Sequence, residues 1–457
     1  MGNRTGLTRE IGIFDATMIV ISGVIGGGIF FTPAVVAQHL PDGRWILAVW
    51  VLGAVIAIAG ALTFAELAAR YPQAGGHYVY IREAFGSLPA FLYGWMLLLI
   101  IATGALASLA LAFAGYVASF VPLSPLLQKL VAVVIVVLLS ALNLLGLKPG
   151  TRANTTLTII KVGAFAAMIG MGLLVDAQAT SMTAPELEDV GLLVGFGAAL
   201  VPVLFSYGGW QQLNFMAGEV RAPERRVPRA LLLGVGLVAL VYIGGNIVYL
   251  RALGPQGMAG SGALARDASL ALFGETAGRI VTALVAISIL AFSNVVVMAT
   301  PRVFYALAND GVFLRSLAQL HPRFGTPARA IMLQGTWTVV LILVGNIGAL
   351  VNGVVFADWI FFGLGAASIF MVRKRMGVTD VSGVTGVTGV SGTRGAAGMF
   401  RVPGYPWVPL FFVLAALAAV SSAIRQYPLE SLVGGLLLGV GAGLHSVQTR
   451  RASAIAS

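Results

Sequence analysis

The stretch "GVIGGGIFF", residues 23–31, decides how this chain is interpreted. It lies inside the first strongly apolar segment, where Met18, Ile19, Val20 and Ile21 would ordinarily continue as a helix. Each glycine in a helix interior costs about 1 kcal/mol relative to alanine. Three consecutive glycines at 26–28 therefore predict that this apolar helix is interrupted near its middle.

The composition places the segment in a membrane protein. The 457 residues are 58% hydrophobic and only 10% charged, whereas soluble domains carry about 25% charged residues. Such a chain cannot cover its surface in water, so we expect an all-α integral membrane protein. The chain has no cysteine, which excludes disulfides, thiolate metal sites and a disulfide-linked partner subunit.

Twelve segments are apolar and long enough to cross a bilayer as helices. The expected spans are 14–38, 45–69, 88–119, 127–146, 153–175, 192–217, 229–251, 277–307, 330–348, 351–372, 405–424 and 428–447. They form one domain over 1–457. A Gly/Thr/Ser-rich stretch at 378–398 is expected to be a flexible linker before the last two helices, 404–447.

The distribution of basic residues predicts the orientation of these spans. The two termini and the even-numbered connections hold 21 of the 28 Lys and Arg residues, and the odd-numbered connections hold six. The positive-inside rule then places both termini in the cytoplasm and the protein in the plasma (inner) membrane. The net charge of +11 is thus explained by topology, and no nucleic-acid partner is expected.

A second interruption follows five spans later. Gly208 and Gly209 lie inside the sixth apolar segment. Five is an odd number, so the second set of five spans (about 190–372) enters the membrane from the side opposite to the first (about 12–176). Two broken segments at matching places in halves of opposite topology are typical of inverted-repeat transporters. The alternative is close helix packing, since glycine is common in membrane helices.

The broken backbone itself suggests the ligand. Irregular backbone at membrane depth is tolerated where it lines a cavity or is buried in protein. One broken end exposes N–H groups, which suit a carboxylate, and the other exposes C=O groups, which suit an ammonium. A pair of such breaks therefore favours a zwitterionic solute.

Several motifs, in order along the chain, carry a family resemblance. They are "GVIGGGIFFTP" (23–33), "FAELAARYPQAGGHYVYIREAFG" (64–86), "LFSYGGWQQLNF" (204–215), "GEVRAPERRVPRA" (218–230) and "FRVPGYPWVP" (400–409). Together they resemble the L-type amino acid transporter (LAT) branch of the amino acid–polyamine–organocation (APC) superfamily, over about residues 8–430. The resemblance implies a LeuT-like 5+5 inverted repeat plus two C-terminal helices, with helices 1 and 6 broken.

The same resemblance implies where an amino acid would bind. The N–H groups of Gly27 and Gly28 would hold its carboxylate, and the carbonyls of Val24, Phe205 and Gly208 its ammonium. Phe205 would also close over the substrate, and serine is usual in the family where Gly27 stands. The expected substrate-binding residues are Val24, Ile25, Gly26, Gly27, Gly28, Ile29, Phe205, Ser206, Gly208, Gly209, Trp210 and Gln211.

Two charged residues lie deep within expected spans, where charges are functional by default. The resemblance implies that Lys161 stands in place of a sodium ion and ties the first break, near Gly23, to Ser293 or Asn294 in the eighth span. The alternative for Lys161 is a lysine facing a hydrated vestibule. Asp358 would be a proton-coupling or cation-selecting group, or a hydrated residue near the outer surface.

Other titratable residues are expected to serve structure. Glu66 and Glu219, near cytoplasmic ends of spans, are expected to pair with Arg70 and loop arginines. His77 is expected in a cytoplasmic loop. With four histidines and no cysteine, neither a metal site nor a cofactor is expected.

The sequence therefore predicts a secondary transporter that moves neutral L-amino acids by alternating access, through sodium-independent exchange. A proton-coupled symporter, or a carrier of cationic amino acids or amines, is the alternative within transport. A membrane enzyme, a channel and a receptor are disfavoured because no catalytic or nucleotide-binding motif is present and two breaks around one site suit occlusion. The expected partners are the amino acid and the lipid bilayer, and the preferred amino acid and the oligomeric state stay open.

Overall fold

The computed structural model describes residues 7–175, 191–345, 347–375 and 399–456. The linker expected at 378–398 lies outside these residues. The described parts contain helices joined by turns and one isolated two-residue bridge, between Ile11 and Val220. In chain order the helices are α1 (Ile13–Val24), α2 (Gly28–His39), α3 (Gly43–Arg70), α4 (His77–Phe85), α5 (Ser87–Met96), η1 (Leu97–Ile101), α6 (Ala102–Ala118), α7 (Pro125–Leu144), α8 (Leu147–Leu174), α9 (Leu192–Ser206), α10 (Gln212–Phe215), η2 (Ala217–Glu219), α11 (Pro223–Gly260), α12 (Leu264–Phe273), α13 (Glu275–Ala299), α14 (Pro301–Asn309), η3 (Arg315–Ala318), α15 (Ala328–Val344), α16 (Ile347–Arg375), α17 (Trp407–Gln426) and α18 (Pro428–Ala456).

Among the described residues, ten helical stretches are long and apolar enough to cross a membrane. Two shorter apolar helices, α9 and α15, occupy the positions of the expected sixth and ninth spans. The sixth is short because its helix ends at Ser206, just before the glycine pair. An all-helical membrane fold is therefore confirmed.

Several boundaries differ from expectation for local reasons. Helix α8 begins at Leu147, six residues before the expected start, because its polar first turns are also helical. Helix α11 continues to Gly260 across a kink at Gly254, whose φ of 64° suits glycine. The short helices α4 and α12, which hydropathy does not reveal, pack against the ends of the long helices.

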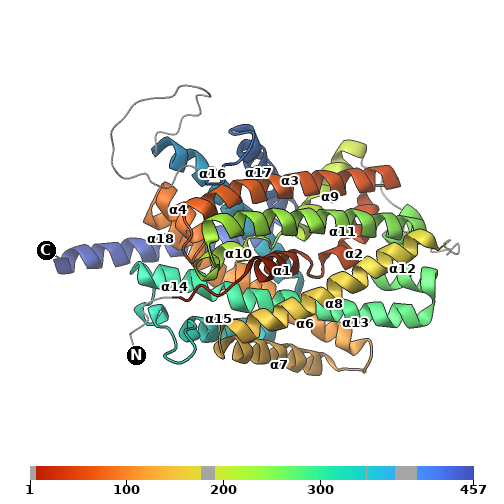
Figure 1. Cartoon of the computed structure of the whole chain (residues 1–457), viewed down its shortest axis with the longest axis horizontal. Coiled ribbons are helices and arrows are strands. Elements are labelled where there is room, and N and C mark those ends of the chain that lie inside the picture. Colours follow the sequence, from red (N-terminus) through yellow and green to blue (C-terminus); the bar gives the residue numbers. More distant parts are fainter. Residues whose placement is uncertain (1–6, 176–190, 346, 376–398, 457) are drawn as a thin grey trace.

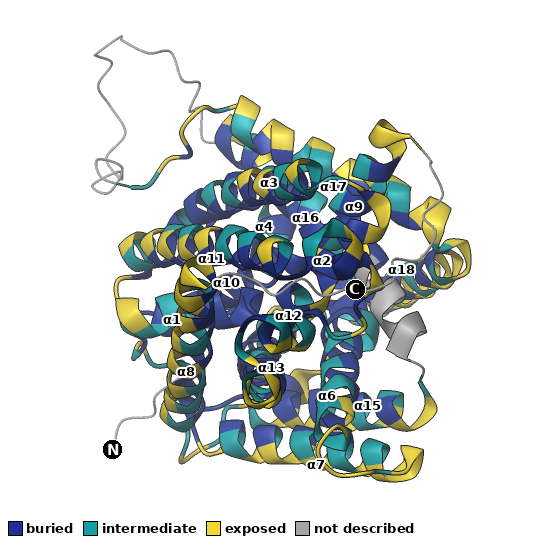
Figure 2. Cartoon of the chain, turned by 90° about the vertical axis from the view of Figure 1, so that its right-hand side faces the viewer, coloured by how far each residue is buried: buried dark blue, intermediate teal, exposed yellow. Residues whose placement is uncertain are grey.

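The long helices run side by side along the long axis of the molecule (Figure 1). One end holds α4, α14 and the first and last described residues; we call it the termini end. The opposite end holds α12 and the junction of α2 with the turn before α3; we call it the α12 end. Seen from that end, exposed residues lie on the outward faces of the peripheral helices and buried residues face inward (Figure 2).

The side chains exposed on the outward faces of the peripheral helices are mostly apolar. On α7, Leu130, Val134, Val137 and Leu138 are each about half exposed. Monomeric soluble proteins rarely expose contiguous apolar surface of this kind. These faces are consequently suited to lipid, whereas α1, α3, α6, α11 and α13 are covered mainly by protein.

Candidate functional site

The first break separates α1 from α2 at Ile25–Gly27. Helix α1 ends at Val24 and α2 starts at Gly28, so three residues at the centre of one span leave the helical path. Phe30 donates its N–H to the carbonyl of Gly27 at 3.0 Å. Within the described hydrogen bonds, the N–H groups of Gly27, Gly28 and Ile29 have no acceptor. Unpaired N–H groups at a helix start form a partial positive charge that suits an anion.

The second break separates α9 from α10 at residues 207–211. Gly209 adopts a φ of 102°, and its N–H donates to the side-chain oxygen of Gln211 at 2.7 Å. A Cβ at Gly209 would lie 1.8 Å from the carbonyl oxygen of Gly23. A Cβ at Gly23 would in turn lie 2.5 Å from the carbonyl oxygen of Gly209. The two breaks therefore touch backbone to backbone, which requires glycine at both positions.

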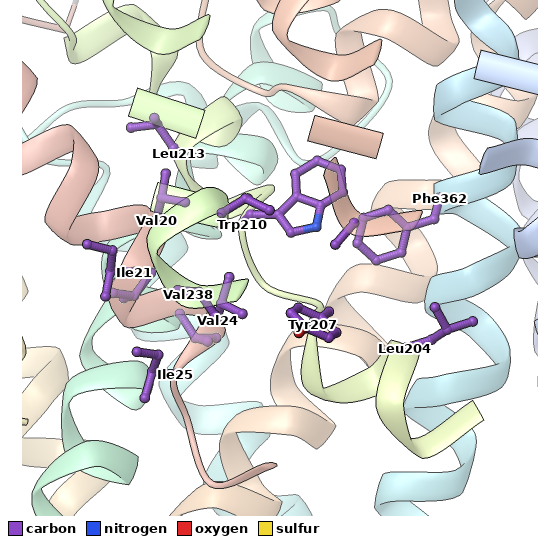
Figure 3. Packing of buried hydrophobic residues seen from close by; sticks show 14 of the residues in the cluster. Val20, Ile21, Val24, Ile25, Leu204, Tyr207, Trp210, Leu213, Val238 and Phe362 are labelled. Atoms are coloured by element: carbon purple, nitrogen blue, oxygen red, sulfur yellow. The ribbon is translucent and has the colours of Figure 1, made fainter. Parts of the chain in front are cut away.

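A cavity of about 560 Å³ lies beside these breaks. From the first break it is lined by Val24 and by Gly26, Gly27 and Gly28; from the second break and the end of α9 it is lined by Phe205, Ser206, Gly208, Gly209 and Gln211. Ile25, Ile29 and Trp210 are not in this lining and are buried in the protein core. Trp210 instead lies against Phe362 of α16, with ring centroids 5.4 Å apart (Figure 3).

The cavity opens toward the α12 end. Its lining continues to His39 at the end of α2, to Tyr116 late in α6 and to Tyr427 between α17 and α18. Phe205, the expected lid, projects into the open space with 37% of its surface exposed. The central site is thus accessible from one end of the bundle.

The walls are mainly apolar with one charge. Asp358 of α16 is the only acidic residue among the described residues that line the cavity, and no lysine or arginine lines it. Asp358 is partly exposed to the cavity. This aspartate therefore faces the same space as the helix breaks.

The termini end of the bundle is closed by buried polar contacts. Arg302 of α14 donates to both carboxylate oxygens of Glu219, at 2.7 and 3.0 Å, and both side chains are buried. The carbonyl of Glu219 accepts the N–H groups of Glu10 and Ile11 at 2.8 and 2.9 Å. These hydrogen bonds join the segment before α1 to the segment after α10, on the termini side of the cavity.

Lys161 of α8 contacts the first break. Its ammonium donates to the carbonyl of Ile25 at 2.5 Å and lies 3.3 Å from both the carbonyl and the hydroxyl of Ser22. The side chain is buried. The amino group of Lys161 thus binds the backbone of the first break directly.

The partner in α13 differs from the expected one. The hydroxyl of Ser288 lies 3.0 Å from the carbonyl oxygen of Ile25 and 2.7 Å from that of Gly26, and its single proton can be donated to either. Asn294 instead binds Asn143 and the carbonyl of Gly150, and the hydroxyl of Ser293 has no partner among the described residues. The expectation was wrong because α13 meets the break more than one helical turn closer to the α12 end.

Tyr242 of α11 is a site residue that sequence reasoning missed. Its hydroxyl lies 2.9 Å from the carbonyl of Val24 and 3.2 Å from that of Ser206, so it joins the two breaks. The carbonyl of Val24 also accepts the N–H of Gly26 at 2.8 Å. Both lone pairs of Val24 are then used, whereas the carbonyl of Gly208 accepts no described hydrogen bond.

Glu66 and His77 do not line the cavity. Glu66 binds Arg70, as expected, and also Arg373 and the N–H of Val402. His77 does not lie in a loop: it begins α4 and packs edge-on against Phe64 at 4.3 Å. Burial lowers the pKa of His77 to about 3. The described residues include no cluster of His, Cys, Asp and Glu placed to hold a metal.

Taken together, a solute cavity between two touching helix breaks, open at one end of a membrane bundle and closed at the other, defines a membrane transporter. The chain matches the family described as amino acid permease over residues 11–433. It therefore belongs to this family, within the APC superfamily, and is an amino acid transporter.

Named relatives cover most of the chain. The serine/threonine exchanger SteT of Bacillus subtilis (strain 168) is 30% identical, over 98% of this chain and 99% of its own. The b(0,+)-type amino acid transporter 1 of Oryctolagus cuniculus is 32% identical, over 81% and 77%. The large neutral amino acids transporter small subunit 2 of Mus musculus is 31% identical, over 81% and 72%.

Proposed function

We propose that this protein exchanges neutral L-amino acids across the plasma membrane by alternating access, without sodium. The proposal that no sodium is needed rests on Lys161, because its ammonium already supplies a positive charge to the carbonyls of the first break. A sodium ion would compete for the same carbonyl oxygens and the same space. The exchange mode agrees with the name of SteT, a serine/threonine exchanger.

Backbone groups of the two breaks bind the carboxylate and the ammonium of the amino acid. Its carboxylate accepts from the free N–H groups of Gly27, Gly28 and Ile29, at the positive end of α2. Its ammonium donates to the free carbonyl of Gly208. The apolar walls take the side chain, which favours small and medium neutral amino acids.

Transport requires the open end to close and the closed end to open. We place both termini in the cytoplasm, so that the α12 end faces outward and the described state is outward-open. Phe205 swings over the bound substrate, and the Arg302–Glu219 pair separates to release it inside. The two sets of five spans form the inverted repeat of a LeuT-like fold, with two additional helices after it and no covalent chemistry.

Counterflow in liposomes tests this function. Purified protein is reconstituted without sodium and without a pH gradient, and uptake of labelled alanine and labelled serine is followed with and without unlabelled amino acid trapped inside. We expect saturable uptake that depends on the trapped amino acid. Equal uptake into empty vesicles, or uptake that requires sodium, would contradict the proposal.

Asp358 supports a second candidate, a proton-coupled carrier or a carrier of cationic amino acids. As the one acidic group lining the cavity within the described residues, it could pair with a proton or with a cationic side chain. Asp358→Asn keeps the shape and removes the charge. Loss of arginine and lysine competition in this variant, or loss of uptake driven by an inward proton gradient, would favour this candidate; unchanged counterflow would favour neutral exchange.

A further inference from the structure

A second cavity, of about 400 Å³, lies at the α12 end beside the mouth of the central one. Helices α2, α6, α12 and α13 surround it; α12 contacts α2 and α13, and α13 contacts α6. The same four helices surround the centre of the molecule as seen from this end (Figure 2). Tyr116 lines both cavities, so the second one adjoins the route to the helix breaks.

The wall of this second cavity carries charges of both signs. Arg266 of α12 lines it and, among the described residues, has no ion-pair partner. Glu275 and Arg279, in the first turns of α13, line it as well and are 3.3 Å apart. Both members of this pair are more than half exposed, and exposed pairs hold each other weakly. Glu275 is therefore available to a competing cation.

The rest of the lining is aromatic and apolar. Phe30 lies in α2, three residues beyond the first break, and packs edge-on against Phe165 of α8 at 5.4 Å. Tyr116 in the last turn of α6 and Phe120, two residues beyond the end of α6, line the cavity as well. An apolar side chain can be accommodated here while the charged groups remain near the opening.

We propose that this cavity is an accessory binding site for a zwitterionic amino acid on its way into the transporter. The free guanidinium of Arg266 binds the carboxylate, Glu275 binds the ammonium, and the aromatic wall takes the side chain. The proposal rests on the amino acid transport proposed above. It adds a second site, which is loaded only from the side that the α12 end faces.

The arrangement also explains how substrate reaches a cavity without basic residues. Of the described lining residues, the central cavity offers one acidic group and no lysine or arginine, so it has no side chain that attracts a carboxylate from a distance. Charged groups at a cleft mouth raise the local ligand concentration and the association rate. Arg266 supplies that attraction at the entrance, and the free N–H groups bind the carboxylate deeper inside.

The test compares the two sides of the membrane, because this site is loaded only from the side that the α12 end faces. Arg266→Gln is compared with wild type for the KM of counterflow at the α12 side and, in a separate assay, at the termini side. Arg251→Gln is the matched control: Arg251 is exposed in the last turns of α11 and does not line this cavity. Arg266→Lys tests whether the positive charge alone suffices.

We expect Arg266→Gln to raise the KM for alanine about threefold or more at the α12 side, within the range of electrostatic steering. The KM at the termini side should stay at the wild-type value, and Arg251→Gln should match wild type at both sides. Arg266→Lys should recover most of the loss. Glu275→Gln should make external glutamate a stronger competitor, because Glu275 is the one acidic group among the described residues that line the cavity.

Other outcomes overturn the accessory site. If the KM at the α12 side does not change in Arg266→Gln, the cavity does not take part in loading. An equal rise in Arg251→Gln would indicate general surface potential, and an equal rise at both sides would indicate a structural effect. Absence of any counterflow in the wild type would instead contradict the transport function itself, so the two failures are distinguishable.

Discussion

At the scale of single residues, Lys161 has the largest predicted effect. Lys161→Ala removes the cation from the carbonyls of Ser22 and Ile25 and leaves both buried. A charge-assisted hydrogen bond contributes about 1.5–3 kcal/mol. Losing that free energy slows a transport step that needs the break in its present conformation by about tenfold or more. We expect counterflow to fall by at least that factor while the protein still purifies as a folded monodisperse species.

The control for this variant is Lys129→Ala. Lys129 also donates to a backbone carbonyl, that of Leu343 at 2.7 Å, but it is exposed and lies far from the break in the chain. It should keep wild-type counterflow. Wild-type exchange in Lys161→Ala would show that the break does not need the lysine.

His77 makes stability depend on pH in a defined direction. Burial among aromatic rings holds its pKa at about 3 in the folded protein, against about 6.5 when unfolded. Between these values the unfolded state binds the extra proton, so stability falls as the pH drops from 6.5 toward 3. Above pH 6.5 the residue is neutral in both states and contributes no pH dependence.

His77→Phe tests this dependence because phenylalanine has a similar shape and cannot be protonated. We expect the Tm in detergent to fall less steeply between pH 6.5 and pH 4.5 in the variant than in the wild type. Above pH 7 the two slopes should coincide. Identical slopes over the whole range would mean that His77 is hydrated in the folded protein.

At the scale of elements, the contact between the two breaks is the tightest constraint. Gly209→Ala puts a Cβ into the carbonyl of Gly23 at a φ that side chains rarely adopt. The breaks would have to move apart, since neither the backbone carbonyl nor the φ can yield cheaply. We expect a Tm loss of several degrees together with loss of amino acid binding.

Gly163→Ala is the matched control for that substitution. Gly163 lies in the interior of α8, and nothing lies within 4 Å of a Cβ placed there. Alanine is favoured over glycine in a helix by about 1 kcal/mol, so this variant should be as stable as the wild type or more stable. A Gly209→Ala protein with wild-type Tm and binding would refute the close approach.

The elements show what the sequence can and cannot predict. Apolar length and runs of glycine predicted the helices and both interruptions, because these signals are local. Ser288 and Tyr242 were missed because their role depends on how α13 and α11 are rotated and shifted against α1. His77 was misplaced because α4 is too short and too polar to stand out, and only tertiary packing buries its first residue.

At the scale of the whole molecule, the buried Arg302–Glu219 pair holds one end closed. Removing a single partner of a buried pair leaves the other charge unpaired and costs about 3–5 kcal/mol. Arg302→Met should therefore destabilise the described state relative to one in which Glu219 is hydrated, that is, with the termini end open. We therefore expect the equilibrium to shift from the described state toward the state with the termini end open.

The absence of cysteine makes this shift measurable with one reporter. Ala198→Cys, on the lining of the cavity near the α12 end, should react with a membrane-impermeant thiol reagent added at that end. We expect the reaction to slow when Arg302→Met is added and to stay unchanged when Arg323→Met, an exposed arginine substitution, is added. An unchanged rate with Arg302→Met would mean that this pair does not control access.

The two deep charges have an electrical consequence for the cell. A carrier that exchanges one zwitterion for another moves no net charge, because both solutes are neutral, and Lys161 and Asp358 add none to the exchange when both are ionised. A membrane potential acts on a transported charge with about 2.3 kcal/mol per 100 mV, and here it has nothing to act on. Such a transporter cannot accumulate its substrate at the expense of the voltage; it can only equalise the ratios of one amino acid to another across the membrane.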